Sequence, residues 1–205
     1  MSSARSGYDS LVRRKKKGAV KLEAMPGLRS FHHLENEHGL ILRQVEIFEE
    51  ALSRLHYEGK PRLGENLKRL NRVLTFFESH LPKVFKIEGG VFFPFVRRHV
   101  PKLEAATRML EEDHRRIRGQ LKTFEAWLGR YQKACQKGSE GYPARRLRET
   151  GAYLACFLKT HLEAEKATVC RTVHAELYPE EKALLRSQMK EGQKNASIPR
   201  GRLRK

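Results

Sequence analysis

Apolar residues recur every three or four positions along most of this chain, which is the pattern of amphipathic helices. The first such run extends from Leu28 to Leu55, and the second from Leu63 to Glu88. The third follows Pro101 and reaches Leu128, and the fourth starts near Ala144 and reaches Val169. No stretch long enough for a β-strand alternates between apolar and polar residues with period two, so we predict no sheet. The pattern predicts an all-α protein, an up-down-up-down four-helix bundle with short connections.

Several breaks in the pattern set the expected ends of these helices. The segment 58–61 (Glu-Gly-Lys-Pro) is expected to end the first helix, and 138–143 is expected to be a loop. Pro82 lies inside the second run, so we expect it to kink that helix or to divide it in two. The apolar cluster 91–95 is expected to close one end of the core, and 179–190 to form a short fifth helix.

Polar residues replace apolar ones at a few inward positions of this pattern. His161 and Glu165 are four residues apart, so they lie on one helix face, which also carries Leu154 and Leu158. Three more such residues occupy the inward seams of the other helices: His38, Glu88 and His114. An imidazole or a carboxylate in an apolar seam is costly unless something binds it, and a metal ion is the simplest candidate.

The two halves of the chain repeat each other. Glu37-His38 aligns with Asp113-His114 at an offset of 76, and Glu88 aligns with Glu165 at an offset of 77. Two copies of one helical hairpin would bring their seam residues to a common centre, as in bundles that hold a two-metal carboxylate–histidine site. The repeat also shows a difference, because the position equivalent to His161 is Val84.

His80 is the one histidine near that missing position, one helical turn before Val84. It could replace the absent ligand if the bend at Pro82 turned its ring inward. It could equally lie on the outer flank of the helix.

On these residues the chain resembles the hemerythrin-like, or HHE cation-binding, family over roughly 28–175. That family is a four-helix bundle with a non-haem di-iron site, in which one helix of each hairpin gives a His and the other gives a His-x-x-x-Glu pair. His161-Leu162-Glu163-Ala164-Glu165 matches this pair fully. The second helix matches in Glu88 and in the following Phe92-Phe93-Pro94, but it lacks the His, and Gly89 stands where a second acid is usual.

The resemblance implies iron, two ions or one, as the cofactor, and mixed imidazole and carboxylate ligands suit that metal. The implied ligands are His38, Glu88, His114, His161 and Glu165, with His80 as a sixth candidate. It implies binding or sensing of a small ligand such as dioxygen or nitric oxide, or the handling of iron. Repair of damaged iron–sulfur centres is less favoured, because 1–27 contains no cysteine. The sequence shows no catalytic acid–base set, so catalysis at the iron is the last choice.

The chain carries a formal charge of +18, and much of that charge lies near its ends. Residues 1–27 hold seven Lys or Arg against two acids, and 186–205 hold seven against one. We therefore divide the chain into a basic tail (1–27), the bundle (28–178) and a short helix with a second basic tail (179–205). This charge suggests a second hypothesis: an interaction or regulatory bundle with an incomplete metal site, whose tails contact nucleic acid or another polyanion.

Other features of the composition bear on location. No apolar run is long enough to span a membrane, and the N-terminus has no secretory pattern, so we expect a cytoplasmic protein. The three scattered cysteines agree with a reducing compartment.

Overall fold

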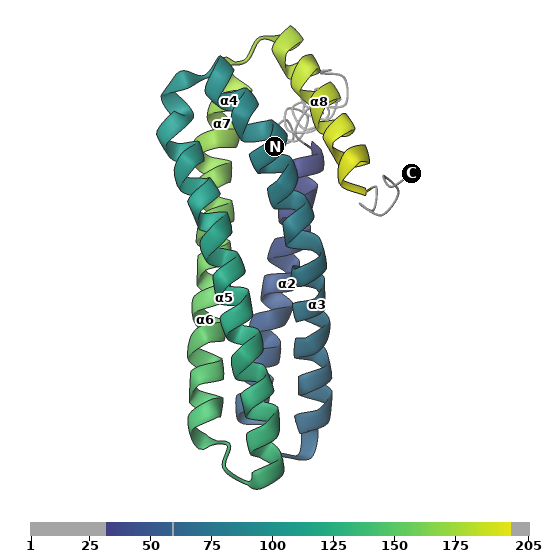
Figure 1. Ribbon diagram of the computed structural model, residues 1–205, viewed down its shortest axis with the longest axis vertical. Helices are drawn as coiled ribbons and strands as arrows, with labels where there is room; N and C mark the ends of the chain where they lie inside the picture. Colours follow the sequence, from purple (N-terminus) through teal and green to yellow (C-terminus); the bar gives the residue numbers. More distant parts are fainter. Residues whose placement is uncertain (1–31, 59, 198–205) are drawn as a thin grey trace, which may run out of the picture.

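The computed structural model describes residues 32–58 and 60–197, and every regular element in that part of the chain is a helix. Four helices are long: α2 (His32–Tyr57), α3 (Leu63–Ile87), α5 (Glu104–Lys137) and α6 (Gly141–Ala164). They lie side by side along the long axis of the molecule (Figure 1). The prediction of an all-helical bundle is therefore confirmed.

Shorter elements join or extend the long helices. A 3₁₀ turn, η3 (Lys60–Arg62), precedes α3, and a second, η5 (Pro101–Leu103), precedes α5. The π-helical segment η4 (Glu88–Phe92) and α4 (Phe93–His99) continue α3. The π-helical segment η6 (Glu165–Cys170) and α7 (Arg171–Glu176) continue α6 in the same way, and α8 (Pro179–Ser197) follows.

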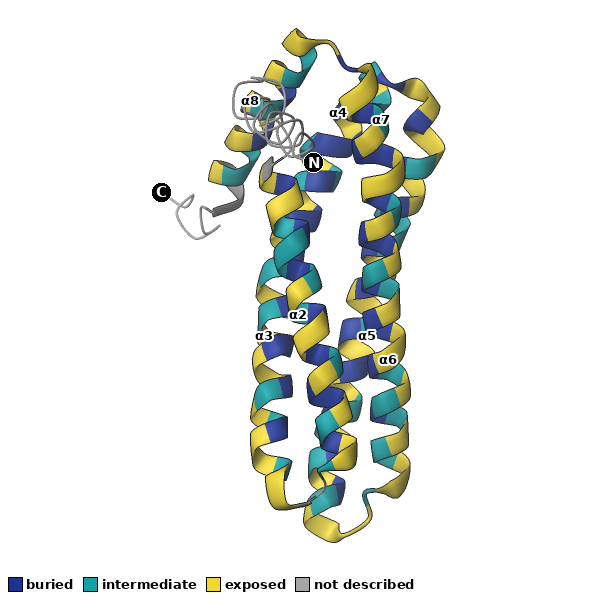
Figure 2. Cartoon of the chain, turned by 180° about the vertical axis from the view of Figure 1, so that it is seen from behind, coloured by how far each residue is buried: buried dark blue, intermediate teal, exposed yellow. Residues whose placement is uncertain are grey.

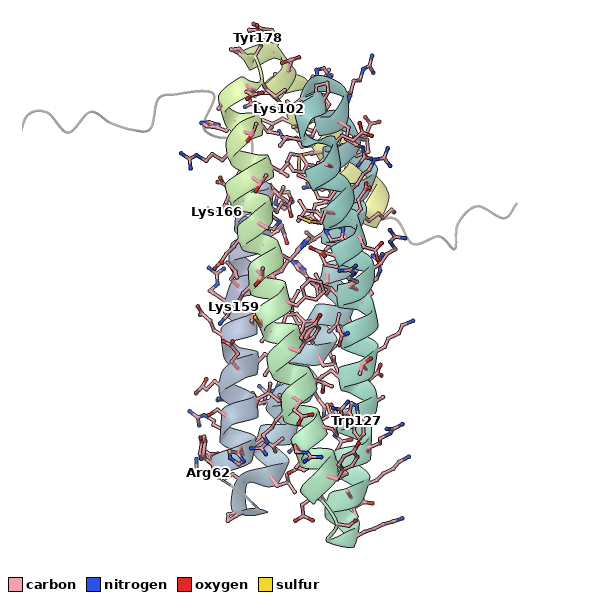
Figure 3. All side chains as sticks on the ribbon, turned by 90° about the vertical axis from the view of Figure 1, so that its left-hand side faces the viewer. Arg62, Lys102, Trp127, Lys159, Lys166 and Tyr178 are labelled. Atoms are coloured by element: carbon pink, nitrogen blue, oxygen red, sulfur yellow. The ribbon has the colours of Figure 1, made fainter. Side chains whose placement is uncertain are left out.

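The two ends of the bundle differ. The α2–α3 and α5–α6 connections lie at one end, whereas α4, α7 and α8 lie at the other (Figure 1). Figure 3 labels a residue near each end of the bundle, Arg62 near the first and Tyr178 at the second. Helix α8 runs back from Tyr178 and packs on α3 and η4, so it covers the first hairpin more than the second.

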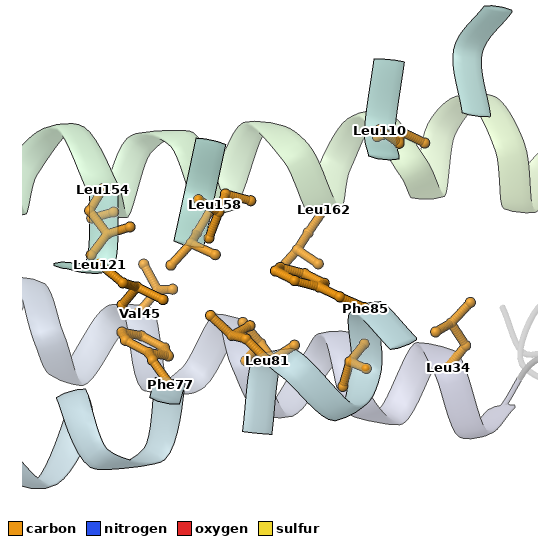
Figure 4. Close-up of a cluster of buried hydrophobic side chains, with 14 of the residues drawn as sticks. Leu34, Val45, Phe77, Leu81, Phe85, Leu110, Leu121, Leu154, Leu158 and Leu162 are labelled. Carbon is orange, nitrogen blue, oxygen red and sulfur yellow. The ribbon is translucent and has the colours of Figure 1, made fainter. Parts of the chain in front are cut away.

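The interior is built from the apolar faces that the sequence pattern predicts. Buried residues recur at regular intervals along each helix, and exposed residues lie between them on the outer faces (Figure 2). Leucines of α6 point inward opposite Phe77, Leu81 and Phe85 of α3 (Figure 4). The Phe48 ring makes edge contacts with Phe77 and Phe124, with centroids 5.9 and 4.8 Å apart, so the middle of the bundle is aromatic.

Two expected helix ends need correction, and one of the two alternatives at Pro82 is excluded. Helix α3 is not divided at Pro82 but continues through it, with the proline exposed on the outer face, and a kink there stays a prediction. The fourth helix begins at Gly141 rather than near Ala144, because Pro143 fits in a first turn, where its missing N–H costs nothing. The last helix reaches Ser197 instead of Lys190.

The connection between α5 and α6 is a short glycine turn. Gly138 has φ of +67°, the left-handed conformation in which glycine is favoured, and the N–H groups of Gly138 and Ser139 both donate to the Ala134 carbonyl. The turn reverses the chain within three residues. The basic tails predicted at 1–27 and beyond 197 lie outside the described residues. In the described chain no helix has the length and apolar character to cross a membrane.

Candidate metal centre

Five polar side chains meet inside the bundle, toward the end that carries α4 and α8. They come from different elements: His38 from α2, Glu88 from the start of η4, His114 from α5, His161 from α6 and Glu165 from the start of η6. All five are buried, and the two glutamates are the most deeply buried of them. These are the five seam residues that the helical rhythm selects, so the structure brings all of them together.

Glu88 lies between two imidazoles that belong to different hairpins. Its Oε1 is 2.9 Å from His38 Nε2, and its Oε2 is 3.1 Å from His114 Nε2. The first contact has hydrogen-bond geometry, whereas the second does not. One carboxylate therefore faces both halves of the repeat, which is the placement of a carboxylate that could bridge two ions.

Glu165 occupies the equivalent place in the second hairpin. Its Oε2 is 3.7 Å from His38 Nε2 and 3.9 Å from His161 Nε2. Two compact groups of ligand atoms result, His38–Glu88–Glu165 and His114–His161–Glu165, each with its atoms within 4.8 Å of one another. Because Glu165 belongs to both groups, the arrangement offers two neighbouring places for a cation.

The polar atoms of this centre lack ordinary partners. Neither ring nitrogen of His161 and neither carboxylate oxygen of Glu165 has a hydrogen bond, and the same holds for Glu88 Oε2 and His114 Nε2. Buried polar groups in proteins are nearly always hydrogen-bonded, and a bare buried carboxylate costs several kcal/mol. Side chains of this type fit a metal cation, which would satisfy the oxygens and nitrogens together.

The pKa values of Glu165, Glu88 and His161 also indicate that this buried centre lacks a compensating positive charge. Burial, with the nearby charge of Glu88 second, raises the pKa of Glu165 well above its usual range. Burial also acts to raise the pKa of Glu88, but His114 and His38 outweigh it and hold that pKa at about 2. Burial, aided by His114 and opposed by Glu88 and Asp113, lowers the pKa of His161 to about 4. A neutral imidazole is the form that binds metals.

Neighbouring side chains fix the rings of the centre. Phe85 stacks on His114 with centroids 3.9 Å apart and an interplanar angle of 11°, and Phe93 stacks at 5.7 Å. Asp113 Oδ2 lies 3.5 Å from His161 Nδ1 without a hydrogen bond, so Asp113 is the carboxylate placed to orient this imidazole once it binds a metal. Asp113 is visible in the sequence only as the acid that precedes His114 in the repeat, and its contact with His161 joins two helices, which no single helical pattern contains.

Helix geometry changes at the two glutamates. Each is the first residue of a π-helical segment, η4 after α3 and η6 after α6. Such segments widen a turn by one residue and often mark functional sites. The repeat thus extends to a backbone irregularity that the residue pattern does not predict.

The structure places His80 apart from these groups. Its Nε2 lies 2.5 Å from Glu37 Oε2, and its ring stacks on Phe76 with centroids 4.7 Å apart. Val84 is buried where the second hairpin has His161, and it lines a cavity of about 240 Å³ together with His80. His80 is in neither group of ligand atoms, so its ligation to this centre stays a prediction.

Several other histidines, and Tyr153, are residue types that could bind a metal or line its site, but they lie away from the centre. His33, His56 and His174 are exposed, and His99 pairs with Glu181, its Nδ1 2.7 Å from Oε1. Tyr153 is mostly exposed and packs beside Phe157.

Helical bundles build metal sites in their cores from imidazoles and carboxylates on facing helices, and the buried cluster of this chain is of that type. The model of the hemerythrin family, described as the hemerythrin HHE cation-binding domain, matches residues 29–173. The chain belongs to this family. Comparison with curated proteins finds no match.

Proposed function

We propose that this protein binds two iron ions through His38, Glu88, His114, His161 and Glu165, and that it binds or senses a small ligand such as dioxygen or nitric oxide there, or handles iron. One observation carries the proposal: two groups of buried ligand atoms from opposite hairpins share Glu165. The mixture of imidazole nitrogen and carboxylate oxygen suits iron among the common transition metals.

The side chains around the centre would control what reaches it. When bound, iron with an open coordination position supplies a place where a small molecule can attach. Phe85 and Phe93 cover the His114 ring and keep water from that side. Asp113 would hold the Nδ1 side of His161, so that Nε2, which lies toward Glu165, is left to act as the ligand atom.

The two halves of the centre would not be equal. The His114–His161–Glu165 group has two imidazoles, whereas the His38 side has one, because Val84 supplies no donor. Glu88 Oε2 also lies 3.1 Å from His114 Nε2, so if Glu88 bridges, the His114 side has four protein ligands and the His38 side three, which leaves more positions there for an added ligand. We therefore infer that the His38 side is where the small ligand attaches.

We also infer an up-down-up-down bundle made of two repeated hairpins. The equivalent π-helical segments at Glu88 and Glu165 support this, as do the shared positions of His38 and His114.

The test is the iron content per chain with an ultraviolet–visible spectrum, for protein from iron-supplied cells. His161→Ala is the variant, and His56→Ala, an exposed histidine at the opposite end of the bundle, is the matched control. In the parent and in the control we expect about two iron ions per chain and a charge-transfer band. In His161→Ala we expect the iron and the band to be lost. About one ion would mean a half-site opened by Val84. No iron in any folded protein would refute the proposal.

A second function is favoured by the departures at Val84 and Gly89. If the centre holds no metal, the chain would act as an interaction or regulatory bundle whose basic tails contact nucleic acid or an acidic partner. Attraction of this kind falls steeply with salt and ignores base sequence. Binding of a random polyanion by the full chain at low and high salt would test it, and loss on removing either basic end is the expected result.

A further inference from the structure

A cavity of about 240 Å³ lies on the outer side of the α2–α3 pair, beneath α8. Its lining includes Val84, at the position where the first hairpin lacks a ligand, and Met189 from α8. Its polar lining includes titratable side chains that the centre does not use: His33, Glu37, His80 and Lys83.

Glu37 joins two histidines in this cavity. Its Oε1 lies 3.5 Å from His33 Nδ1, one turn earlier on α2, and its Oε2 lies 2.5 Å from His80 Nε2 on α3. Neither Glu37 Oε2 nor His80 Nε2 is exposed to solvent, and neither has a hydrogen bond with good geometry. Two imidazoles and one carboxylate form a donor set that transition metals bind while keeping open positions.

The internal repeat explains how this cluster arises. In the second hairpin Asp113 contacts His161, which points to the centre. Glu37 is the equivalent of Asp113, and it contacts His80 instead, because its hairpin has Val84 at the equivalent position. The acid–histidine contact of the repeat is thus kept in the first hairpin but is displaced by one turn, out of the centre and into the cavity.

We propose that His33, Glu37 and His80 form an outer site for a divalent transition-metal cation, separate from the buried centre and next to its His38 side. Glu37 directly precedes His38, so an ion held there is one residue along α2 from an inner ligand. A role as the entry point for metal rests on the proposed function, whereas binding at the outer site does not.

The exposure of the cluster suits entry from solvent. The side chains of His80 and Glu37 are 22% and 25% exposed, and that of His33 is 50% exposed. His33 faces the other oxygen of Glu37, so its ring must turn about its side-chain bonds to share one ion with His80. The His80–Glu37 pair must also separate to admit the ion. Lys83 lines the cavity but is exposed, and its flexible stem allows the ammonium to turn toward water.

The test is calorimetric titration of the metal-free full chain with Co²⁺, followed in parallel by the visible absorption of bound Co²⁺. His80→Gln removes the imidazole and keeps a polar group beside Glu37. His161→Ala damages only the inner centre, and Lys83→Ala changes the same cavity without removing a ligand atom. Circular dichroism checks that each variant is folded.

In His80→Gln we expect one binding event to weaken at least about tenfold while the events that need His161 remain. Lys83→Ala should keep or tighten that same event, because it removes a positive charge. Identical titrations of His80→Gln and the parent would overturn the outer site. If His161→Ala instead titrates like the parent while His80→Gln loses one event, the outer site stands and the proposed function fails.

Discussion

Glu88 and Glu165 are each the first residue of a π-helical segment, and each follows a long helix of its own hairpin. Their side chains then reach the same interior point from opposite hairpins, where both lie near His38 Nε2. Burying two carboxylates this close is unfavourable without a cation. These two carboxylates therefore destabilise the metal-free protein, and variants that change them should alter its stability measurably.

Glu165→Gln is expected to stabilise the metal-free protein at neutral pH and to abolish metal binding at the shared position. The folded-state pKa of Glu165 is raised above its unfolded value, so folding takes up a proton, and stability falls as pH rises above about 4.5. The glutamine needs no proton, so the gain at pH 7 should be about 1–3 kcal/mol. Thermal unfolding of the metal-free proteins between pH 4 and pH 8 measures it. An equal loss of stability at every pH would contradict this account.

Val84→His is expected to complete the repeat. The new imidazole would stand one turn before Glu88, as His161 stands one turn before Glu165. Metal affinity on the His38 side should rise about tenfold or more. Even residues that only hydrogen-bond to a metal ligand change metal affinity on that scale, and a new ligand should do at least as much. Azide binding, read from the spectrum of the iron-loaded protein, should weaken because an open position is lost. Val84→Leu, which adds bulk but no donor, should leave the metal affinity unchanged.

Gly151→Ala is expected to destabilise the fold, because α6 lies against its neighbours there with no space for a methyl group. A Cβ at position 151 would come within 2.5 Å of Leu52 Cδ1 and 3.0 Å of Phe124 Cε2. Overpacking of a core typically costs about 1–3 kcal/mol. Gly129→Ala is the matched control, because nothing lies within 4 Å of its Cβ position and alanine favours a helix interior by about 1 kcal/mol. Denaturant unfolding of both variants should give shifts of opposite sign.

Cys156 and Cys170 should react at different rates with a thiol-alkylating reagent. Cys156 is exposed, whereas Cys170 is buried, and burial, then the charges of Glu165 and Glu88, raises the pKa of its thiol. The thiolate is the reactive form, so Cys170 stays protonated and unreactive at neutral pH. Mass spectrometry of alkylated peptides, in buffer and in denaturant, measures the two rates. Equal labelling of both in the native protein would contradict the burial of η6.

The sequence predicts the long helices and the five-residue centre because both depend on one periodicity. A helix turns by a fixed amount per residue, so His38 and His114 can be assigned to inward faces from their spacing to apolar neighbours. The π-helical segments could not be predicted, since they depend on which carbonyl accepts a hydrogen bond after Ile87 or Ala164. The direction of His80 depends on its contact with Glu37 across two helices, which no single helical pattern contains.

The shared position of Glu165 has a consequence for motion. His38 and Glu88 belong to the first hairpin and Glu165 to the second, so an ion held by all three would fasten the hairpins together. Without the ion we expect each hairpin to open as its own cooperative unit, because such units often coincide with supersecondary motifs. With it, exchange in α2 and in α6 would follow a single slow opening. Loading would then convert two local opening reactions into one global reaction.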